Sequence, residues 1–107
     1  MITNLKYDDF HKFLNSNELP TVIDIWAYGC PPCDGIESIL TQMENRYGDQ
    51  ILRIGRINVD DNEEIAKEYR LRAVPTVLFF EKGALQNQLV VPKPDDLRSE
   101  IDNFVNF

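Results

Sequence analysis

Segments with the residue spacing of β-strands alternate along this chain with segments that have the spacing of α-helices, which limits the folds open to it. The clearest strand covers residues 21–26, where both alternating sets of side chains are largely apolar. That pattern is typical of a central strand covered by helices on both faces. The other expected strands are a weak one near 2–5, then 51–59, 76–80 and a hairpin partner at 85–91. The expected helices are 8–15, a segment with apolar positions from 36 to 47, a short one that follows 60–64 and ends at Tyr69, and one after Pro94. Strands that alternate with helices and end in a hairpin indicate an α/β chain with one sheet layered by helices.

Acidic residues stand where two of these helices begin. Asp8 or Asp9 is expected to cap the first helix, and residues 60–64 supply a cap and first-turn acids for the third. The chain has 107 residues, which favours a single domain over 1–107. The N-terminal residues lack the basic and then apolar layout of a secretory signal, so we expect a cytoplasmic protein.

The net charge of the chain limits which partners it can bind. Eleven Lys and Arg against eighteen Asp and Glu give a formal net charge of −7. A field of that sign repels phosphate backbones and anionic lipid surfaces, so we expect neither nucleic acid nor a membrane as a partner. The acidic surface and the small size favour a monomer.

The two cysteines, Cys30 and Cys33, lie between the expected strand 21–26 and the helix that follows it. Active sites of such sheets lie beyond the C-terminal ends of strands. Cys30 falls near the helix N-cap, with Pro31 at a position that tolerates proline. Two residues of separation place both sulfurs on one helix face, close enough for a disulfide, and a helix N-terminus favours the thiolate. We therefore favour a redox-active pair.

Two other interpretations of the cysteine pair remain open. The pair could be half of a metal site, but the chain has no further Cys and only one His, His11. A complete site would need a dimer or that distant histidine. The two thiols could also be inert and structural.

Asp24 and Pro75 are two further candidates near this site. Asp24 lies inside the expected central strand, where burial would raise its pKa. Its structural role would be that of a buried acid whose carboxylate is paired with Arg56 on the next strand. Its functional role would be to accept and return the proton of Cys33. A random X–Pro bond is cis only about 5–6% of the time, so the sequence alone predicts a trans Val74–Pro75 bond.

Five segments together resemble the thioredoxin family, over nearly the whole chain and with its spacing between motifs: Asp24-Ile25-Trp26-Ala27, Cys30-Pro31-Pro32-Cys33, Asn58-Val59-Asp60, Val74-Pro75-Thr76 and Lys82-Gly83. The resemblance implies the thioredoxin fold, a central mixed sheet flanked by four helices. It implies that Cys30 attacks, that Cys33 resolves and that Asp24 is the buried acid of the site. It further implies a cis Pro75 that faces the dithiol, a Val74 backbone that pairs with extended substrate, and a Trp26 packed beneath the site. No metal or organic cofactor is implied.

Several residues depart from the family pattern of Trp-Cys-Gly-Pro-Cys. Gly29 stands in place of the exposed Trp, and Pro31 replaces the Gly. Arg56 occupies the position of a Lys near the buried acid, where it can act only as a fixed charge. Val91, followed by Pro92, falls where the family has a Gly that lets partners approach. These changes alter the expected substrate-binding surface and put recognition by a standard thioredoxin reductase in doubt. That surface is expected to comprise Trp26, Gly29, Pro31, Val74, Pro75 and Val91.

The resulting hypothesis is a thiol–disulfide oxidoreductase that reduces protein disulfides through Cys30 and Cys33, with electrons from an unidentified reductase. A more oxidising oxidase or isomerase is the related alternative. The alternative from another class is a thioredoxin-fold binding module or adaptor in which the dithiol is incidental.

Overall fold

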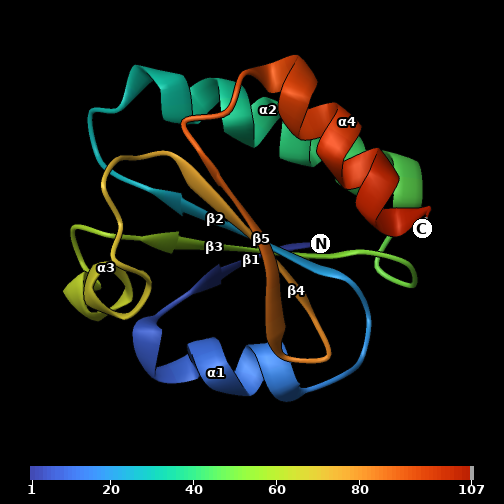
Figure 1. The fold of residues 1–107 in the computed structure, drawn as a ribbon, viewed down its shortest axis with the longest axis horizontal. Coiled ribbons are helices and arrows are strands. Elements are labelled where there is room, and N and C mark those ends of the chain that lie inside the picture. Colours follow the sequence, from blue (N-terminus) through green and yellow to red (C-terminus); the bar gives the residue numbers. More distant parts are fainter. Residues whose placement is uncertain (107) are drawn as a thin grey trace.

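The computed structural model describes residues 1–106, and Phe107, the last residue of the expected 1–107 domain, lies outside them. Five strands and four helices follow one another in the expected order (Figure 1). Their bounds are β1 Ile2–Leu5, α1 Tyr7–Asn15, β2 Thr21–Trp26, α2 Pro31–Tyr47, β3 Arg53–Asn58, α3 Glu63–Tyr69, β4 Thr76–Glu81, β5 Ala84–Val90 and α4 Pro94–Val105. The strand and helix segments expected from the sequence are thus all present.

The strands form one mixed sheet in the order β1-β3-β2-β4-β5. β3 runs parallel to both β1 and β2, while β4 runs antiparallel to β2 and to β5. β2 lies at the centre, and the register sets Asp24 opposite Arg56 of β3 and Val77 of β4. The sheet has the mixed architecture expected from the family resemblance.

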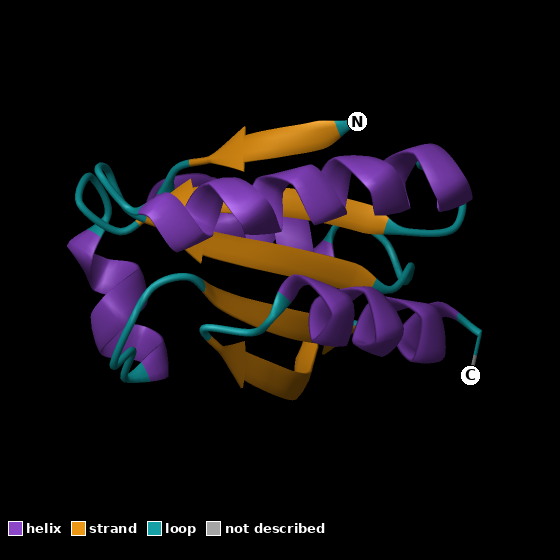
Figure 2. Ribbon diagram, turned by 90° about the horizontal axis from the view of Figure 1, so that it is seen from above, coloured by secondary structure: helices purple, strands orange, loops and turns teal. Residues whose placement is uncertain are grey.

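Helices cover both faces of the sheet (Figures 1 and 2). On one face α2 and α4 contribute Ile36, Leu40 and Ile101 to a buried core that includes Val22 of β2. On the other face α1 and α3 contribute side chains such as Phe10 to a second buried core. Alternate residues of β2 point to opposite faces, so Asp24 shares the α2 face with Val22 and Trp26. The buried acid therefore lies under the helix that begins with the cysteines.

The N-cap of α1 differs from the sequence expectation, whereas α3 begins within 60–64 as expected, with Glu63 and Glu64 in its first turn. Lys6, not Asp8 or Asp9, holds the N-cap position of α1, and it makes no side-chain cap bond. The backbone N–H of Tyr7 donates instead to the side-chain oxygen of Asn62, at 2.9 Å. Asn62 is itself the N-cap residue of α3 but makes no cap bond to its own helix. The expectation for α1 is wrong because a residue more than fifty positions away supplies the acceptor.

Strand β3 is shorter than the expected 51–59. Ile51 and Leu52 lie in a turn in which both backbone N–H groups donate to the carbonyl of Gly48. Their apolar side chains follow the strand pattern, but their amides are already engaged after α2. Among residues 1–106, no helix combines the length and the apolar composition needed to cross a bilayer.

Candidate active site

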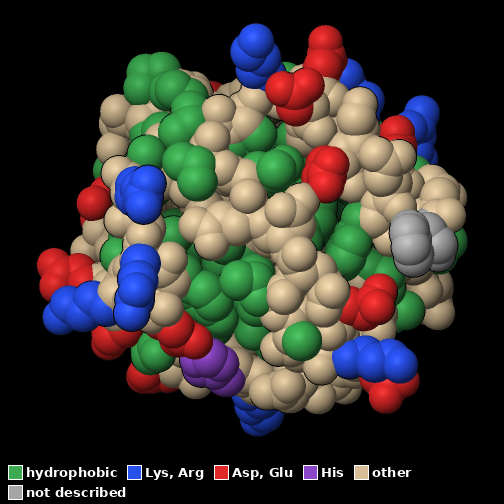
Figure 3. Space-filling model, viewed as in Figure 1, with side chains coloured by type: hydrophobic (Ala, Val, Ile, Leu, Met, Phe, Trp, Pro, Cys, Tyr) green, Lys and Arg blue, Asp and Glu red, His purple; other side chains and the backbone are tan. Residues whose placement is uncertain are grey.

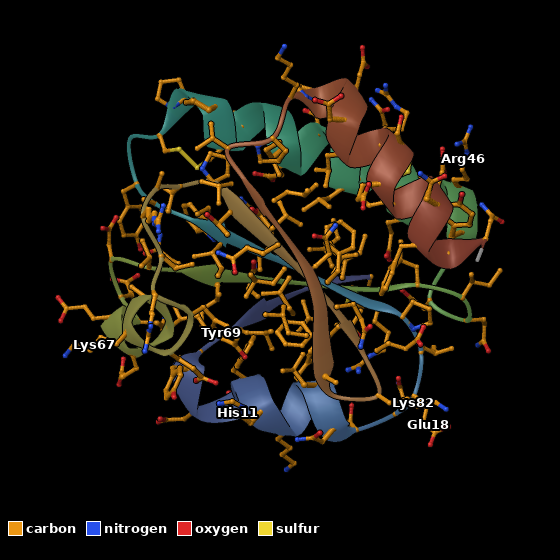
Figure 4. The ribbon with its side chains drawn as sticks, in the orientation of Figure 1. His11, Glu18, Arg46, Lys67, Tyr69 and Lys82 are labelled. Atoms are coloured by element: carbon orange, nitrogen blue, oxygen red, sulfur yellow. A yellow bond between two sulfur atoms is a disulfide. The ribbon has the colours of Figure 1, made fainter. Side chains whose placement is uncertain are left out.

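Cys30 and Cys33 form a disulfide at the start of α2, with Cα atoms 5.4 Å apart (Figure 4). Cys30 is the N-cap residue, and Pro31 and Pro32 fill the first two helical positions. The two sulfurs differ in access, because Cys33 is only 2% exposed whereas Cys30 is partly exposed. The helix begins here because proline fits its first turn and needs no hydrogen-bond acceptor. The expected placement of Cys30 at the N-cap is confirmed.

The loop between β2 and Cys30 is held by two carboxylates. The backbone N–H of Tyr28 donates to Asp60, at 2.9 Å, and its hydroxyl donates to Asp61, at 2.5 Å. That hydroxyl bond raises the pKa of Tyr28 above its ordinary value, so the phenol stays neutral at physiological pH. Gly29 follows with φ of +62°, a backbone conformation that L residues with a side chain rarely adopt. The conformation of the loop therefore favours glycine where the family has an exposed tryptophan.

Asp24 is fully buried and forms an ion pair with Arg56, whose Nε lies 2.8 Å from Oδ2 of the carboxylate. A second nitrogen of the same guanidinium lies 3.0 Å from Glu37 of α2. The guanidinium also lies 4.8 Å from the centre of the Trp26 ring. Burial raises the pKa of Asp24 to about 6, while Arg56 opposes that shift and the charge of Glu37 adds to it. The structure thus confirms the buried acid and its pairing with Arg56.

Pro75 is buried at the start of β4, and the Val74–Pro75 bond is cis. The trans bond expected from the sequence alone is wrong, and the cis bond implied by the resemblance is right. A base rate for X–Pro bonds says nothing of the tertiary contacts around one proline. Here the carbonyl of Pro75 accepts the backbone N–H of Val91 at 2.8 Å. Val91 has φ of +45° and is 44% exposed.

The expected site residues therefore lie in two groups. Trp26, Gly29, Cys30 and Pro31 line one pocket beside the disulfide. Val74, Pro75 and Val91 lie where β4 begins and β5 ends. That Pro75 faces the dithiol and that Val74 pairs with substrate stay predictions.

The sequence reasoning missed three polar side chains of this pocket: Tyr28, Asp34 and Glu37. Asp34 and Glu37 are three positions apart on α2 and share one helix face. That spacing, one and four residues after Cys33, was the available signal for the two acids. No signal marked Tyr28, because an aromatic residue in a loop has many possible partners.

His11 takes no part in this site. It lies on α1, on the opposite side of the sheet from the disulfide (Figure 4), and its Nε2 is 2.9 Å from Glu68 of α3. In the described part of the chain, no group of three or more His, Cys, Asp or Glu side chains has the arrangement of a metal site.

Comparison with known proteins now decides the family. The family model for thioredoxin matches residues 1–103. The chain belongs to the thioredoxin family. A thioredoxin of Porphyra purpurea is 31% identical over 99 residues, covering 91% of each chain. A thioredoxin of Acidithiobacillus ferridurans is 34% identical over 79 residues, covering 74% of this chain and 72% of that one. The crystal structure of a thioredoxin from Malassezia sympodialis matches with a TM-score of 0.87 at 27% identity, covering 97% of this chain and 93% of the other.

Family membership and the disulfide together establish the chemistry. This thioredoxin-family chain is a thiol–disulfide oxidoreductase that cycles between a Cys30–Cys33 disulfide and two thiols. The two sulfurs exchange the electron pair directly with a disulfide of another molecule.

Proposed function

We propose that the protein reduces disulfides of other proteins, with Cys30 as the attacking residue and Cys33 as the resolving residue. The difference in exposure carries this assignment. A substrate disulfide can reach Cys30, whereas Cys33 is 2% exposed and can react only with a sulfur already bound to Cys30. The positive end of the α2 dipole lies at this position and favours the Cys30 thiolate, although Pro31 and Pro32 have no N–H to donate and the N–H of Cys33 donates to the Cys30 carbonyl.

The reduction proceeds in two exchanges. The Cys30 thiolate attacks one substrate sulfur, the substrate S–S bond breaks, and the other substrate sulfur leaves as a thiolate. Cys33 then gives up its proton and attacks the sulfur of Cys30, which releases the second substrate thiolate. Two electrons have passed to the substrate, and Cys30–Cys33 is again a disulfide.

Asp24 is proposed to accept the proton of Cys33 and to return it to solvent. Its pKa of about 6 lies close enough to neutral pH for both protonation states to be used. Asp24 occupies the face of β2 that lies under α2, the helix that carries Cys33. Arg56 keeps its charge throughout and stabilises the carboxylate between exchanges.

Cys33→Ser is the direct test of these roles. Cys30 of this variant should hold protein substrates as stable mixed disulfides, because nothing remains to release them. Mass spectrometry of the trapped species would identify them, and Cys30→Ser is the matched control that should trap none. An equal yield of trapped protein from both variants would contradict the assignment.

The reduction potential of the Cys30–Cys33 pair separates the reductase from its alternatives. Equilibration in defined thiol–disulfide buffers should give a value near about −270 mV, typical of a donor that keeps other proteins reduced. A value of about −180 to −120 mV would indicate an isomerase or oxidase instead. A pair that never forms the disulfide would leave only a binding module.

We further propose that a reductase supplies the electrons and that the protein works as a monomer in the cytoplasm, a compartment that keeps thiols reduced. Gly29 and Val91 support a partner surface unlike that of most of the family. Val91 adds an exposed side chain beside Pro75, and Gly29 removes one beside Cys30. A reductase that serves other thioredoxins is therefore expected to act slowly on this one.

A further inference from the structure

A pocket of about 330 Å³ opens directly beside Cys30. Its volume is at the low end of the range of about 300–1,000 Å³ for ligand sites, which suits one side chain better than a cofactor. Because the pocket reaches the sulfur that a substrate must approach, its occupant would be a group close to the substrate's own disulfide. Its lining residues are Trp26, Ala27, Tyr28, Gly29, Cys30, Pro31, Asp34, Glu37 and Arg56.

One wall of the pocket is aromatic. The rings of Trp26 and Tyr28 meet edge to face, with their centres 5.4 Å apart. Tyr28 is 61% exposed, yet its position is fixed by the hydrogen bonds to Asp60 and Asp61. Such a wall offers apolar surface to an aliphatic chain and ring faces to a cation.

Another part of the lining is acidic. Asp34 and Glu37 project from the first turns of α2, and both are exposed. Within residues 1–106 no ion pair or hydrogen bond engages the Asp34 carboxylate. Arg56 is the cation of the pocket, but it is only 8% exposed and already pairs with Asp24 and Glu37. The lining thus holds two carboxylates and one guanidinium, and the buried Asp24 beneath it also pairs with that guanidinium, which leaves the pocket with a net negative charge.

We infer that this pocket takes a lysine or arginine side chain that lies next to the disulfide cysteine of a substrate protein. The aliphatic stem would lie along Trp26 and Tyr28, and the charged head would reach Asp34 and Glu37. This inference rests on the proposed function, and it names the substrate class: protein disulfides flanked by basic residues. A small anionic disulfide would meet the same carboxylates with the wrong charge.

Single-turnover exchange with synthetic peptides tests the inference. Each peptide carries one cysteine as a mixed disulfide with 2-mercaptoethanol, and the residue beside that cysteine is Lys, norleucine or Glu. Norleucine has a similar aliphatic stem and no charge, so the ratio of the Lys rate to the norleucine rate isolates the ammonium group. Protein reduced beforehand with dithiothreitol supplies both electrons, so no reductase is needed. Both neighbouring positions of the cysteine are tried.

At low salt the Lys peptide should react about three- to fivefold faster than the norleucine peptide, as expected for one partly exposed ion pair. The Glu peptide should be the slowest of the three. The ratio of Lys to norleucine should fall as salt is added, because ions screen exposed charges. In the double variant Asp34→Asn, Glu37→Gln the ratio of Lys to norleucine rates should approach one. Glu37 also raises the pKa of Asp24, so its replacement changes the resolving step. Because both peptides meet the same resolving step in one variant, the ratio of their rates cancels that change.

Asp8→Asn, Asp9→Asn is the matched control, since it removes two exposed charges from α1 on the other face of the sheet. It should keep the preference for Lys. An equal loss of preference in both double variants would overturn the inference in favour of a general effect of net charge. Equal rates for Lys and norleucine in the unaltered protein would overturn it outright. Failure of all three peptides to react would instead count against the proposed function.

Discussion

Asp24 lies in the centre of the sheet with one carboxylate oxygen paired to Arg56 and the other, Oδ1, without any hydrogen-bond partner among the described residues. Burial penalises its charged form more than the single guanidinium favours it, and its pKa therefore rises to about 6. The fold thus loses stability when Asp24 ionises. A residue kept purely for structure would be better replaced by an apolar one.

This cost predicts a pH dependence of stability in the disulfide form. The pKa of Asp24 is about 6 in the native state and about 3.9 when unfolded, so between these values the native state binds more protons. The free energy of unfolding should therefore fall by about 2 kcal/mol as pH rises from about 4 to about 7. Asp24→Asn should lack this contribution and gain stability over the unaltered protein across the same range.

Urea unfolding at a series of pH values would measure the difference between the two proteins. Asp8→Asn, which removes an exposed carboxylate, is the control and should not reproduce the gain. A difference between Asp24→Asn and the unaltered protein that stays constant from pH 4 to 7 would mean that Asp24 does not titrate in this window.

At the scale of elements, the sequence predicted the helices and strands whose formation depends on local residue pattern. The strand 21–26 and the start of α2 follow from β-branched residues and from a proline after Cys30. The contact of Asn62 with the first turn of α1 could not be predicted, because nothing in either segment encodes their approach. The position of Glu37 on the face of α2 could be inferred from its spacing, but its ion pair with Arg56 could not, because Arg56 belongs to a strand that folds beneath the helix. Residues whose partners are distant in the chain become visible only in the folded molecule.

The turn after β5 gives the prediction at this scale. Val91 has φ of +45°, and its backbone N–H is held by Pro75, so the residue cannot relax to an ordinary conformation. A β-branched residue in the left-handed region is strained, whereas glycine is not. Val91→Gly should therefore raise the free energy of unfolding by about 1 kcal/mol.

Urea unfolding of the disulfide form measures this change, with Val90→Gly as the control. Val90 is similarly exposed, at 48%, but it ends β5 in the strand conformation. Glycine there should destabilise by about 0.5–1 kcal/mol. A loss of stability in both variants would show that Val91 is not strained.

Val91→Gly should also be reduced faster by the reductases that serve other thioredoxins.

At the scale of the whole molecule, one sheet separates two buried cores, and the active site lies on the side of only one of them. Asp24 and Cys33 belong to neither core, but Asp24 shares the face of β2 with Val22 of the core under α2 and α4, and Cys33 lies on α2 itself. Both cores nevertheless rest on the same central strand, because alternate residues of β2 enter opposite cores. The two halves should therefore unfold together rather than as separate units.

Truncations in the two cores test this coupling. Phe10→Ala, under α1, and Leu40→Ala, in α2, each remove a fully buried side chain and should lower the free energy of unfolding by about 2–5 kcal/mol. Each variant should unfold in a single transition that is the same by far-ultraviolet circular dichroism and by the fluorescence of Trp26, the only tryptophan. The denaturant dependence should match that of the unaltered protein, because the same surface is exposed on unfolding. If Phe10→Ala shifted the circular dichroism transition while the fluorescence transition beside Cys30 stayed in place, the α1 core would be a separate unit. In that case the active-site half would keep its structure without the other face of the sheet.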